Sequence, residues 1–296
     1  MRISLKVDVD NVVGYKEGLP ALLNLFDQYK IQATFLFSLG YDNSGLRIKN
    51  LFNPRILTKQ LPFSHKLYGT LLPPPSLSKS NKLLIKSCLN AGHDIGIKSF
   101  DSVGWFFGAL DASYEWTKQS LDWSNEVFEE ITGFKPRLHS ASGFVVNKYL
   151  FELEDENDFA IAMDTKGKTA FLPEYLSSTS NVIQMPVTLP SIEELLLLPD
   201  INLDNVHEYL FVESQIPLQH GHVYDVRASY EGRAWLPILE KMIVMWNSSQ
   251  WEFFTITDML KDLKSDELQR HQVGWAKYSP HRQYMASQGI PLNNNQ

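Results

Sequence analysis

The chain has 296 residues, of which 44% are hydrophobic and 21% are charged, so it is long enough and apolar enough to bury a sizeable core. Its net charge of -7 argues against a nucleic-acid partner, because phosphates demand basic patches on the protein. The single cysteine, Cys88, excludes an internal disulfide and is expected to be a buried, inert thiol.

The N-terminal sequence MRISLKVDVD begins directly with a β-like alternation and lacks the apolar core of a signal peptide. No window reaches the ~18 continuous apolar residues of a membrane span. We therefore expect a cytoplasmic protein. Two apolar runs, Trp105–Phe107 and Leu195–Leu198, could form an exposed edge for a peripheral membrane contact, although burial statistics favour core packing for both.

Short β-rich runs alternate with helical runs along most of the chain. Strands are predicted over Ile3–Val9, Thr34–Phe37, Asp94–Ile97, Arg137–Ser140, Ala160–Met163, Val182–Met185, Val223–Ala228 and Phe253–Ile256. Helices are predicted over Glu17–Tyr29, Ser78–Leu89, Ser113–Ile131 and Trp235–Trp246. Gly133 is expected to end the third helix, and Asp258 to cap a short helix after the last strand. Residues 50–72 have no regular pattern.

This repeated order of strand and helix predicts a parallel sheet with helices outside it. Seven or eight strands without a strong break favour an α/β fold, a distorted (β/α)7-8 barrel in one domain over residues 1–268. Residues 269–296 are predicted to be a polar C-terminal extension. The chemistry of such barrels lies at the C-terminal ends of the strands. The strand ends contribute Asp8, Asp10, Lys98, His139, Asp164, Lys166, Arg227, Tyr230 and Glu231.

Asp8-Val9-Asp10 ends the first strand and is the first candidate for chemistry. Residues two apart point to the same side of a strand, so both carboxylates should face one spot. Paired carboxylates commonly divide into a base and a metal ligand. The structural alternative is a solvated strand end with a turn-forming aspartate, and the short pattern alone does not separate the two.

The histidines give weaker signals. His220 and His222 share one face at the start of a strand, opposite the predicted site, so a structural or surface role is favoured over a metal site. His93 is expected to make a structural hydrogen bond. His139 either touches a ligand or is a satisfied strand-end histidine. Lys166-Gly167-Lys168 lacks the pattern of a phosphate-binding loop.

Five segments occur in an order and at spacings that resemble the polysaccharide deacetylase (NodB-homology) superfamily. They are Val7–Asp10, Gly40–Asn43, Ala91–Gly96, Met185–Pro190 and Tyr224–Gly232. Within the superfamily the chain looks most like the deformylases of lipid-linked formamido-sugars, over about residues 3 to 260. The resemblance implies a NodB-like barrel and a metal-dependent amide hydrolase.

The resemblance also implies which residues carry the site. It assigns a general base and a metal ligand to Asp8 and Asp10, two further zinc ligands to histidines at positions 98 and 102, and a general acid to a histidine at position 227. Here these positions hold Lys98, Ser102 and Arg227, and Val145 stands where the deformylases keep an arginine. Asp164, Lys166, Tyr230 and Glu231 correspond to the substrate cleft, and His139 is a further candidate for it.

These replacements remove the usual chemistry. A catalytic zinc needs about three protein ligands, and an ammonium repels a dication. Arginine cannot donate a proton near neutral pH, because its pKa lies above ~12. We therefore expect no metal and no other cofactor. Lys98 is predicted to pair with Asp8 or Asp10, and Arg227 could bridge an aspartate, since clustered carboxylates need compensation. The alternative for Lys98 is an ammonium that reaches solvent.

The leading hypothesis is a degenerate homologue without the catalytic metal site, which binds a carbohydrate, a lipid-linked sugar or a protein partner. A second hypothesis is an active carbon–nitrogen hydrolase of an N-acylated sugar that uses Asp8, Asp10 and Arg227 in a non-standard site. A third is a scaffold subunit of a sugar-processing complex.

Overall fold

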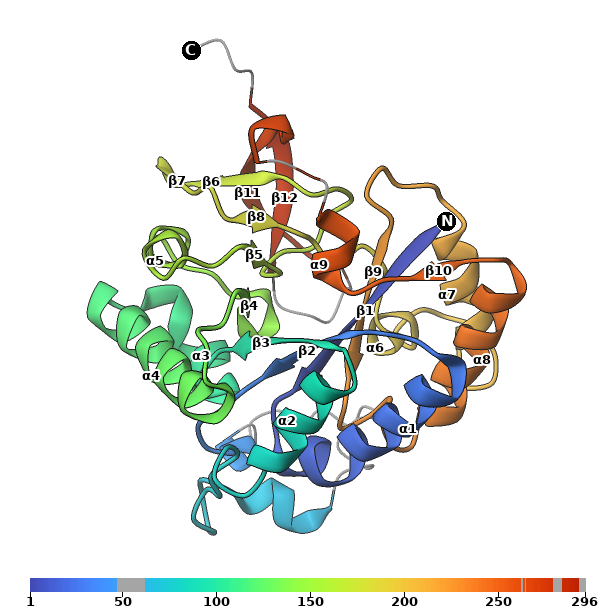
Figure 1. Cartoon of the computed structure of the whole chain (residues 1–296), viewed down its shortest axis with the longest axis horizontal. Helices are drawn as coiled ribbons and strands as arrows, with labels where there is room; N and C mark the ends of the chain where they lie inside the picture. Colours follow the sequence, from blue (N-terminus) through green and yellow to red (C-terminus); the bar gives the residue numbers. More distant parts are fainter. Residues whose placement is uncertain (47–61, 262, 264, 279–283, 293–296) are drawn as a thin grey trace.

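A curved sheet of eight parallel strands forms the centre of the computed structural model (Figure 1). The structure describes residues 1–46, 62–261, 263, 265–278 and 284–292. The strands are β1 (Arg2–Val9), β2 (Thr34–Phe37), β3 (Asp94–Lys98), β4 (Leu138–Ser140), β5 (Ile161–Ala162), β8 (Ile183–Gln184), β9 (His222–Arg227) and β10 (Glu252–Phe253). Their order is β10-β1-β2-β3-β4-β5-β8, and β9 also pairs with β1, outside this path. The backbone N–H of Thr188 donates to the carbonyl of Val223 at 3.1 Å, which links the segment after β8 to β9. The chain thus forms a distorted α/β barrel, as predicted.

Helices surround this sheet. Their bounds are η1 (Gly14–Gly18), α1 (Leu19–Tyr29), η3 (Phe63–Leu67), α2 (Lys82–Asn90), α3 (Ser102–Gly108), η4 (Ala109–Asp111), α4 (Tyr114–Thr132), η5 (Ser142–Phe144), α5 (Leu150–Glu156), α6 (Ile192–Leu195), α7 (Val206–Ser214), α8 (Leu236–Ser248), α9 (Ile256–Leu260) and η6 (Ser265–Glu267). Gly133 ends α4 at a φ of 86°, as predicted. The predicted cap of α9 was wrong, because Thr255 and not Asp258 accepts the hydrogen bond that begins this helix. Of the irregular segment predicted over residues 50–72, residues 50–61 lie outside the described part.

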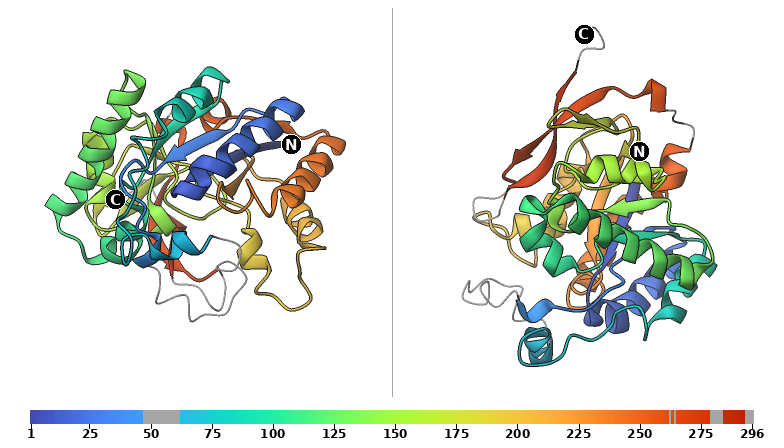
Figure 2. Two further views of the ribbon diagram at one scale, coloured as in Figure 1. Left: turned by 90° about the horizontal axis from the view of Figure 1, so that it is seen from below. Right: turned by 90° about the vertical axis from the view of Figure 1, so that its left-hand side faces the viewer.

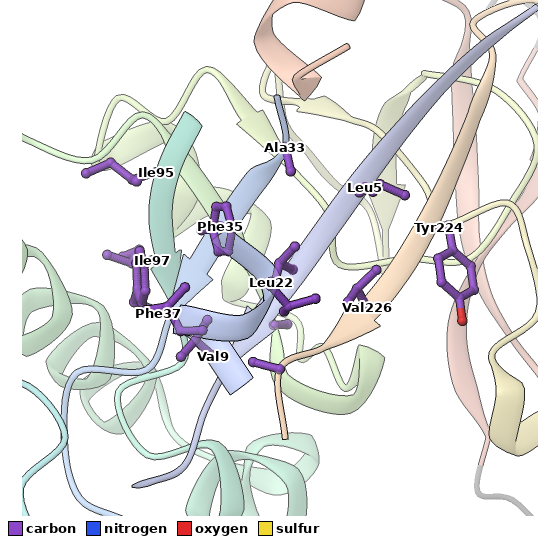
Figure 3. Packing of buried hydrophobic residues seen from close by; sticks show 14 of the residues in the cluster. Leu5, Val9, Leu22, Ala33, Phe35, Phe37, Ile95, Ile97, Tyr224 and Val226 are labelled. Atoms are coloured by element: carbon purple, nitrogen blue, oxygen red, sulfur yellow. The ribbon is translucent and has the colours of Figure 1, made fainter. Parts of the chain in front are cut away.

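Alternation along the strands separates two apolar layers. Leu5 and Val9 of β1 point outward, where they pack with Leu22 of α1 and Phe37 of β2 (Figure 3). The opposite faces of the strands form a smaller apolar cluster inside the barrel, with members Leu36, Leu138, Ile161, Met163 and Val223. Lys6 and Asp8 lie on this inner face of β1, because they alternate with the outward residues. The barrel therefore places charged side chains in its interior.

A second, smaller sheet has the order β12-β11-β6-β7. It contains β6 (Leu172–Tyr175), β7 (Ser178–Thr179), β11 (Arg270–Ala276) and β12 (Met285–Pro291). The predicted polar extension thus contributes an antiparallel pair of strands, and β11 runs parallel to β6. In the right-hand view of Figure 2 these strands lie at one end of the molecule, opposite α1. Met285 and Ala286 are buried, so this part of the chain is less polar in its contacts than its composition suggests.

The two apolar runs considered for a membrane contact divide between core and surface. Trp105 and Leu195 are buried, whereas Phe107 and Leu198 are 49% and 43% exposed. Within the described residues, no helix combines the length and hydrophobicity needed to cross a bilayer. A peripheral membrane contact stays a prediction.

Candidate functional site

A chain of four charged side chains connects β1, β3 and β9, and three of them, Lys6, Asp8 and Lys98, are buried, whereas Asp225 is 14% exposed. Asp8 accepts hydrogen bonds from two ammonium groups, Lys6 on Oδ1 at 2.7 Å and Lys98 on Oδ2. Lys6 also donates to Asp225 Oδ1 at 2.6 Å. The order is Asp225, Lys6, Asp8, Lys98, so the charges alternate in sign. The predicted Lys98–Asp8 ion pair is confirmed, and Lys98 is buried rather than directed to solvent.

Burial and neighbouring charges of opposite sign shift the pKa values of these groups in opposite directions. Burial alone would raise the pKa of Asp8, but the charges of Lys6 and Lys98 outweigh it and lower the pKa below its usual value. Burial and the charge of Asp8 raise the pKa of Asp225, which carries one lysine contact instead of two. The pKa of Lys6 lies above its ordinary range, because the two aspartates overcome the cost of burial. Asp8 is therefore a carboxylate held ionised, and a weak base.

Asp10 lies just beyond the end of β1 and is partly buried. Its Oδ1 accepts a hydrogen bond from Asn11 Nδ2 at 2.9 Å. Among the described residues it forms no ion pair, so the structure does not bring Asp8 and Asp10 to a common cation.

Ser102 is the first residue of α3, and it follows Lys98, the last residue of β3, after a short loop. Its hydroxyl lies 2.5 Å from that of Ser38 and 2.9 Å from that of Ser142, so the ends of β2, β3 and β4 meet in a buried group of hydroxyls. Asp101 caps α3 by accepting from the backbone N–H groups of Val103 and Gly104, each at 3.0 Å. The local fold thus fixes Ser102 firmly, in a setting of neutral donors and acceptors.

Arg227 ends β9 and is only partly buried. Its guanidinium pairs with the buried Glu193 of α6 and lies 5.0 Å from the centre of the Tyr230 ring. The ion pair that the structure gives Arg227 is thus with a glutamate of α6, and the bridge to an aspartate stays a prediction. Its backbone N–H donates to the buried Glu231 at 3.0 Å, and burial raises the pKa of Glu231 to about 7.

Lys166 follows β5 and is also buried. Its ammonium donates to Glu194 Oε2 at 2.5 Å and faces the rings of Phe144 and Tyr278. Glu194 in turn completes a capping box with Ser191 at the start of α6. Helix α6 therefore supplies the partners of both Arg227 and Lys166 through two adjacent glutamates.

His139 lies in a second, fully buried polar cluster with Glu154, Asp164 and Gln184. His139 Nδ1 is 2.6 Å from Glu154 Oε1 and 3.4 Å from Asp164 Oδ1, and Gln184 Nε2 donates to Asp164 Oδ2 at 2.8 Å. Burial alone would lower the pKa of His139, but Asp164 and Glu154 outweigh it and raise the pKa to about 9. The side chains could be considered as metal ligands. However, 2.6 Å is shorter than the about 3.3 Å that separates two ligands of a tetrahedral zinc, so the geometry fits a shared proton.

Three further histidines, His93, His220 and His222, have structural partners. His93 Nδ1 accepts from the backbone N–H of Ala33 at 3.1 Å, which confirms its predicted structural hydrogen bond. His222 lies between the hydroxyl of Thr188 and the carbonyl of Ile216, and His220 accepts from the backbone N–H of Ala170.

The sequence reasoning missed the residues that complete the site, Lys6, Asp225, Glu193, Glu194, Glu154 and Gln184. A signal existed for two of them, because Lys6 and Asp225 precede Asp8 and Arg227 by two residues and therefore share their strand faces. Substrate contacts of His139, Asp164, Lys166, Tyr230 and Glu231 stay predictions, and all five side chains are buried.

The model of the polysaccharide deacetylase family matches residues 8–161, and the chain belongs to this family. It is 26% identical, over 94% of both chains, to a probable 4-deoxy-4-formamido-L-arabinose-phosphoundecaprenol deformylase from Shewanella sediminis. Among solved structures it resembles a probable polysaccharide deacetylase from Pseudomonas aeruginosa, with a TM-score of 0.60, 12% identity and coverage of 88% of this chain and 89% of that one. It also resembles a CE4 family pseudoenzyme from Bacillus anthracis, with a TM-score of 0.52, 12% identity and coverage of 88% and 65%.

The residues at the positions that the family resemblance gives to zinc do not fit a metal ion. Lys98 directs an ammonium at Asp8, and Ser102 offers a neutral hydroxyl that is already bonded to two others. Only Asp8 and Asp10 keep ligands of the expected type, and Asp8 is already paired with two ammonium groups. A dication beside Lys98 would meet a like charge and would have at most two carboxylate ligands where about three ligands are required.

Proposed function

We propose that this chain is a non-hydrolytic member of the polysaccharide deacetylase family that binds a carbohydrate or a lipid-linked sugar. The observation that carries the proposal is the buried Asp8 carboxylate with one lysine ammonium on each oxygen. A general base must be free to accept a proton from water, and both oxygens of Asp8 already accept strong, charge-assisted hydrogen bonds.

The second missing function is the general acid. Arg227 holds its proton throughout the neutral range and is paired with Glu193. The leaving amine of an amide would therefore find no proton donor at this position. These two features argue against the alternative of an active amide hydrolase built on Asp8, Asp10 and Arg227.

The alternating charges also account for how the barrel tolerates the replacements. A buried carboxylate without a cationic partner lowers the stability of the fold by several kcal/mol, so the loss of a metal beside Asp8 requires another cation. Lys98 supplies that cation covalently. The sugar class follows from the family and from the named substrate of the Shewanella sediminis relative, a lipid-linked formamido-sugar.

Metal content and hydrolysis test the proposal together. The protein is purified with added zinc and analysed by mass spectrometry for bound metal, and formamido- and acetamido-sugars are offered as substrates. We expect far less than one zinc per chain and no release of formate or acetate. One zinc per chain together with hydrolysis would establish the active-enzyme alternative. A stable co-purifying protein without sugar binding would instead favour the scaffold.

A graft tests the assignment of positions. The triple variant Lys98→His, Ser102→His, Arg227→His should gain stoichiometric zinc, because two imidazoles then join the aspartates of the first strand as ligands. A matched control carries Lys30→His, Ser249→His and Arg2→His at exposed sites. Equal zinc in both variants would show that added histidines, and not their positions, bind the metal.

A further inference from the structure

A pocket of about 340 Å³ lies between the start of α4, the loop that leads to α5, and the turn from β6 to β7. Figure 1 shows α4, α5 and β7 on the same side of the molecule. Its lining includes Leu110, Asp111, Lys148, Tyr149, Tyr175 and Leu176. None of the lining residues belongs to the chain of charges around Asp8. The volume is at the lower end of the range for small-molecule sites.

The polar groups of this pocket have capacity to bind a ligand. The carboxylate of Asp111 and the hydroxyl of Tyr149 make no hydrogen bond within the described part of the chain. The hydroxyl of Tyr175 accepts from Trp275 Nε1 at 3.2 Å, which leaves its own proton to donate. Together with the ammonium of Lys148, the pocket offers donors and acceptors beside two aromatic rings and two exposed leucines.

The charge of the pocket argues against an anion. Asp111 and Lys148 are of opposite sign. The N-terminus of α4 would attract a phosphate, but it is already capped, because the Ser113 hydroxyl accepts from the Trp116 N–H. The carboxylate of Glu115 lies there too, and hydrogen bonds from its own backbone and from Ser113 lower its pKa. A ligand with many hydroxyls and apolar C–H faces, but no net charge, fits such walls best.

We infer that this pocket binds one neutral sugar unit, outside the barrel site. The choice of a sugar over another polyol rests on the proposed function. The loop after β4 connects the two places, since Ser142 contacts Ser102 and Asn147 to Tyr149 line the pocket. The sugar unit belongs either to a free glycan or to a lipid-linked sugar, and the test below distinguishes these sources.

Two tryptophans allow binding in the pocket and binding at the barrel site to be detected separately. The Trp275 indole N–H donates to Tyr175 in the pocket, and Trp235 stacks on Tyr230 beside Arg227, at a ring distance of 5.3 Å. Protein labelled with ¹⁵N at tryptophan is titrated with methyl glucoside, N-acetylglucosamine, octyl glucoside below its micelle concentration, and glucose 6-phosphate. We expect the neutral sugars to shift the Trp275 resonance, and we expect glucose 6-phosphate to bind more weakly than methyl glucoside.

Substitutions in the pocket test whether the neutral sugars bind there. Tyr149→Ala and Asp111→Ala should each raise the Kd for the neutral sugars about tenfold, whereas Tyr209→Ala, an exposed tyrosine on α7, should not change it. A Trp275 resonance that no neutral sugar moves, or tighter binding of the phosphorylated sugar, would overturn the inference. A shift of Trp235 alone would overturn it while leaving the proposed function intact. Tighter binding of octyl glucoside than of methyl glucoside would identify a lipid-linked source, and equal binding a free glycan.

Discussion

At the scale of single residues, the buried ammonium of Lys6 connects two aspartates of the site, Asp8 and Asp225. An ion pair of Lys98 with Asp8 or Asp10 could be predicted from the sequence, because the family frame places Lys98 at the end of β3, two strands away from β1. The contact of Lys6 with Asp225 could not, since Asp225 lies 219 residues further along the chain and meets Lys6 only through the pairing of β1 with β9. The buried lysine is nevertheless the one cation that contacts both aspartates in the described structure.

The variant Lys6→Met should lower the free energy of unfolding by about 3–5 kcal/mol, because it leaves a buried carboxylate without its partner. Urea unfolding followed by circular dichroism measures the change. The matched control is Lys30→Met, which removes an ion pair to Asp27 whose side chains are 79% and 82% exposed, and which should cost less than about 1 kcal/mol. Addition of Asp225→Asn to Lys6→Met should recover part of the loss. No recovery would mean that the cost is one of packing alone.

At the scale of elements, alternating apolar residues predicted the barrel strands well, because one face of each packs on helices and the other fills the interior. Thr34–Phe37 was placed to the residue. The strands β11 and β12 were missed, since polar residues and glycine interrupt their pattern and their partner β6 is itself short. The Arg227–Glu193 pair was missed for a different reason, because the position of α6 depends on tertiary packing and not on spacing.

The His139 cluster joins three elements, β4, α5 and β8, through one shared proton network. The pKa of His139 is raised from 6.5 to about 9, so the folded state binds this proton more tightly than the unfolded chain. The resulting stability is fully present below about pH 6.5 and is lost as the pH rises through about 9, on the order of 3 kcal/mol.

Urea titrations between pH 6 and 10 should show this decline, and His139→Gln should flatten it. His271→Gln, on the β11–β12 hairpin, serves as the control and should retain the slope. An unchanged slope in His139→Gln would assign the pH dependence to other groups.

At the scale of the whole molecule, the C-terminal strands are part of the folded body. The Lys166 backbone N–H donates to the carbonyl of Ala286 at 3.0 Å, and Gln288 donates back to the carbonyl of Lys166 at 2.8 Å. The hairpin thus bonds to the segment that carries a site residue, and we expect it to unfold together with the barrel.

Met285→Ala should therefore cost about 2–5 kcal/mol of global stability, because Met285 is only 4% exposed. Ile290→Ala on the same strand, at 67% exposure, should change the stability by no more than about 0.5 kcal/mol. Circular dichroism and tryptophan fluorescence should give coincident unfolding curves for both variants. Two separate transitions would show that residues 269–296 form an independent extension.

The position of β1 has a consequence for the order in which this protein folds. The first strand of the chain pairs with β2 nearby, but also with β9 and with β10, whose residues 252 and 253 lie near the other end of the sequence. Closing such long loops is slow, because chain entropy must be lost before the contacts form. Lys6 and Asp8 consequently stay hydrated until β9 docks against β1. The loss of water from these charges then belongs to a late step of folding, and a chain stalled before that step exposes an unpaired edge of its central strand.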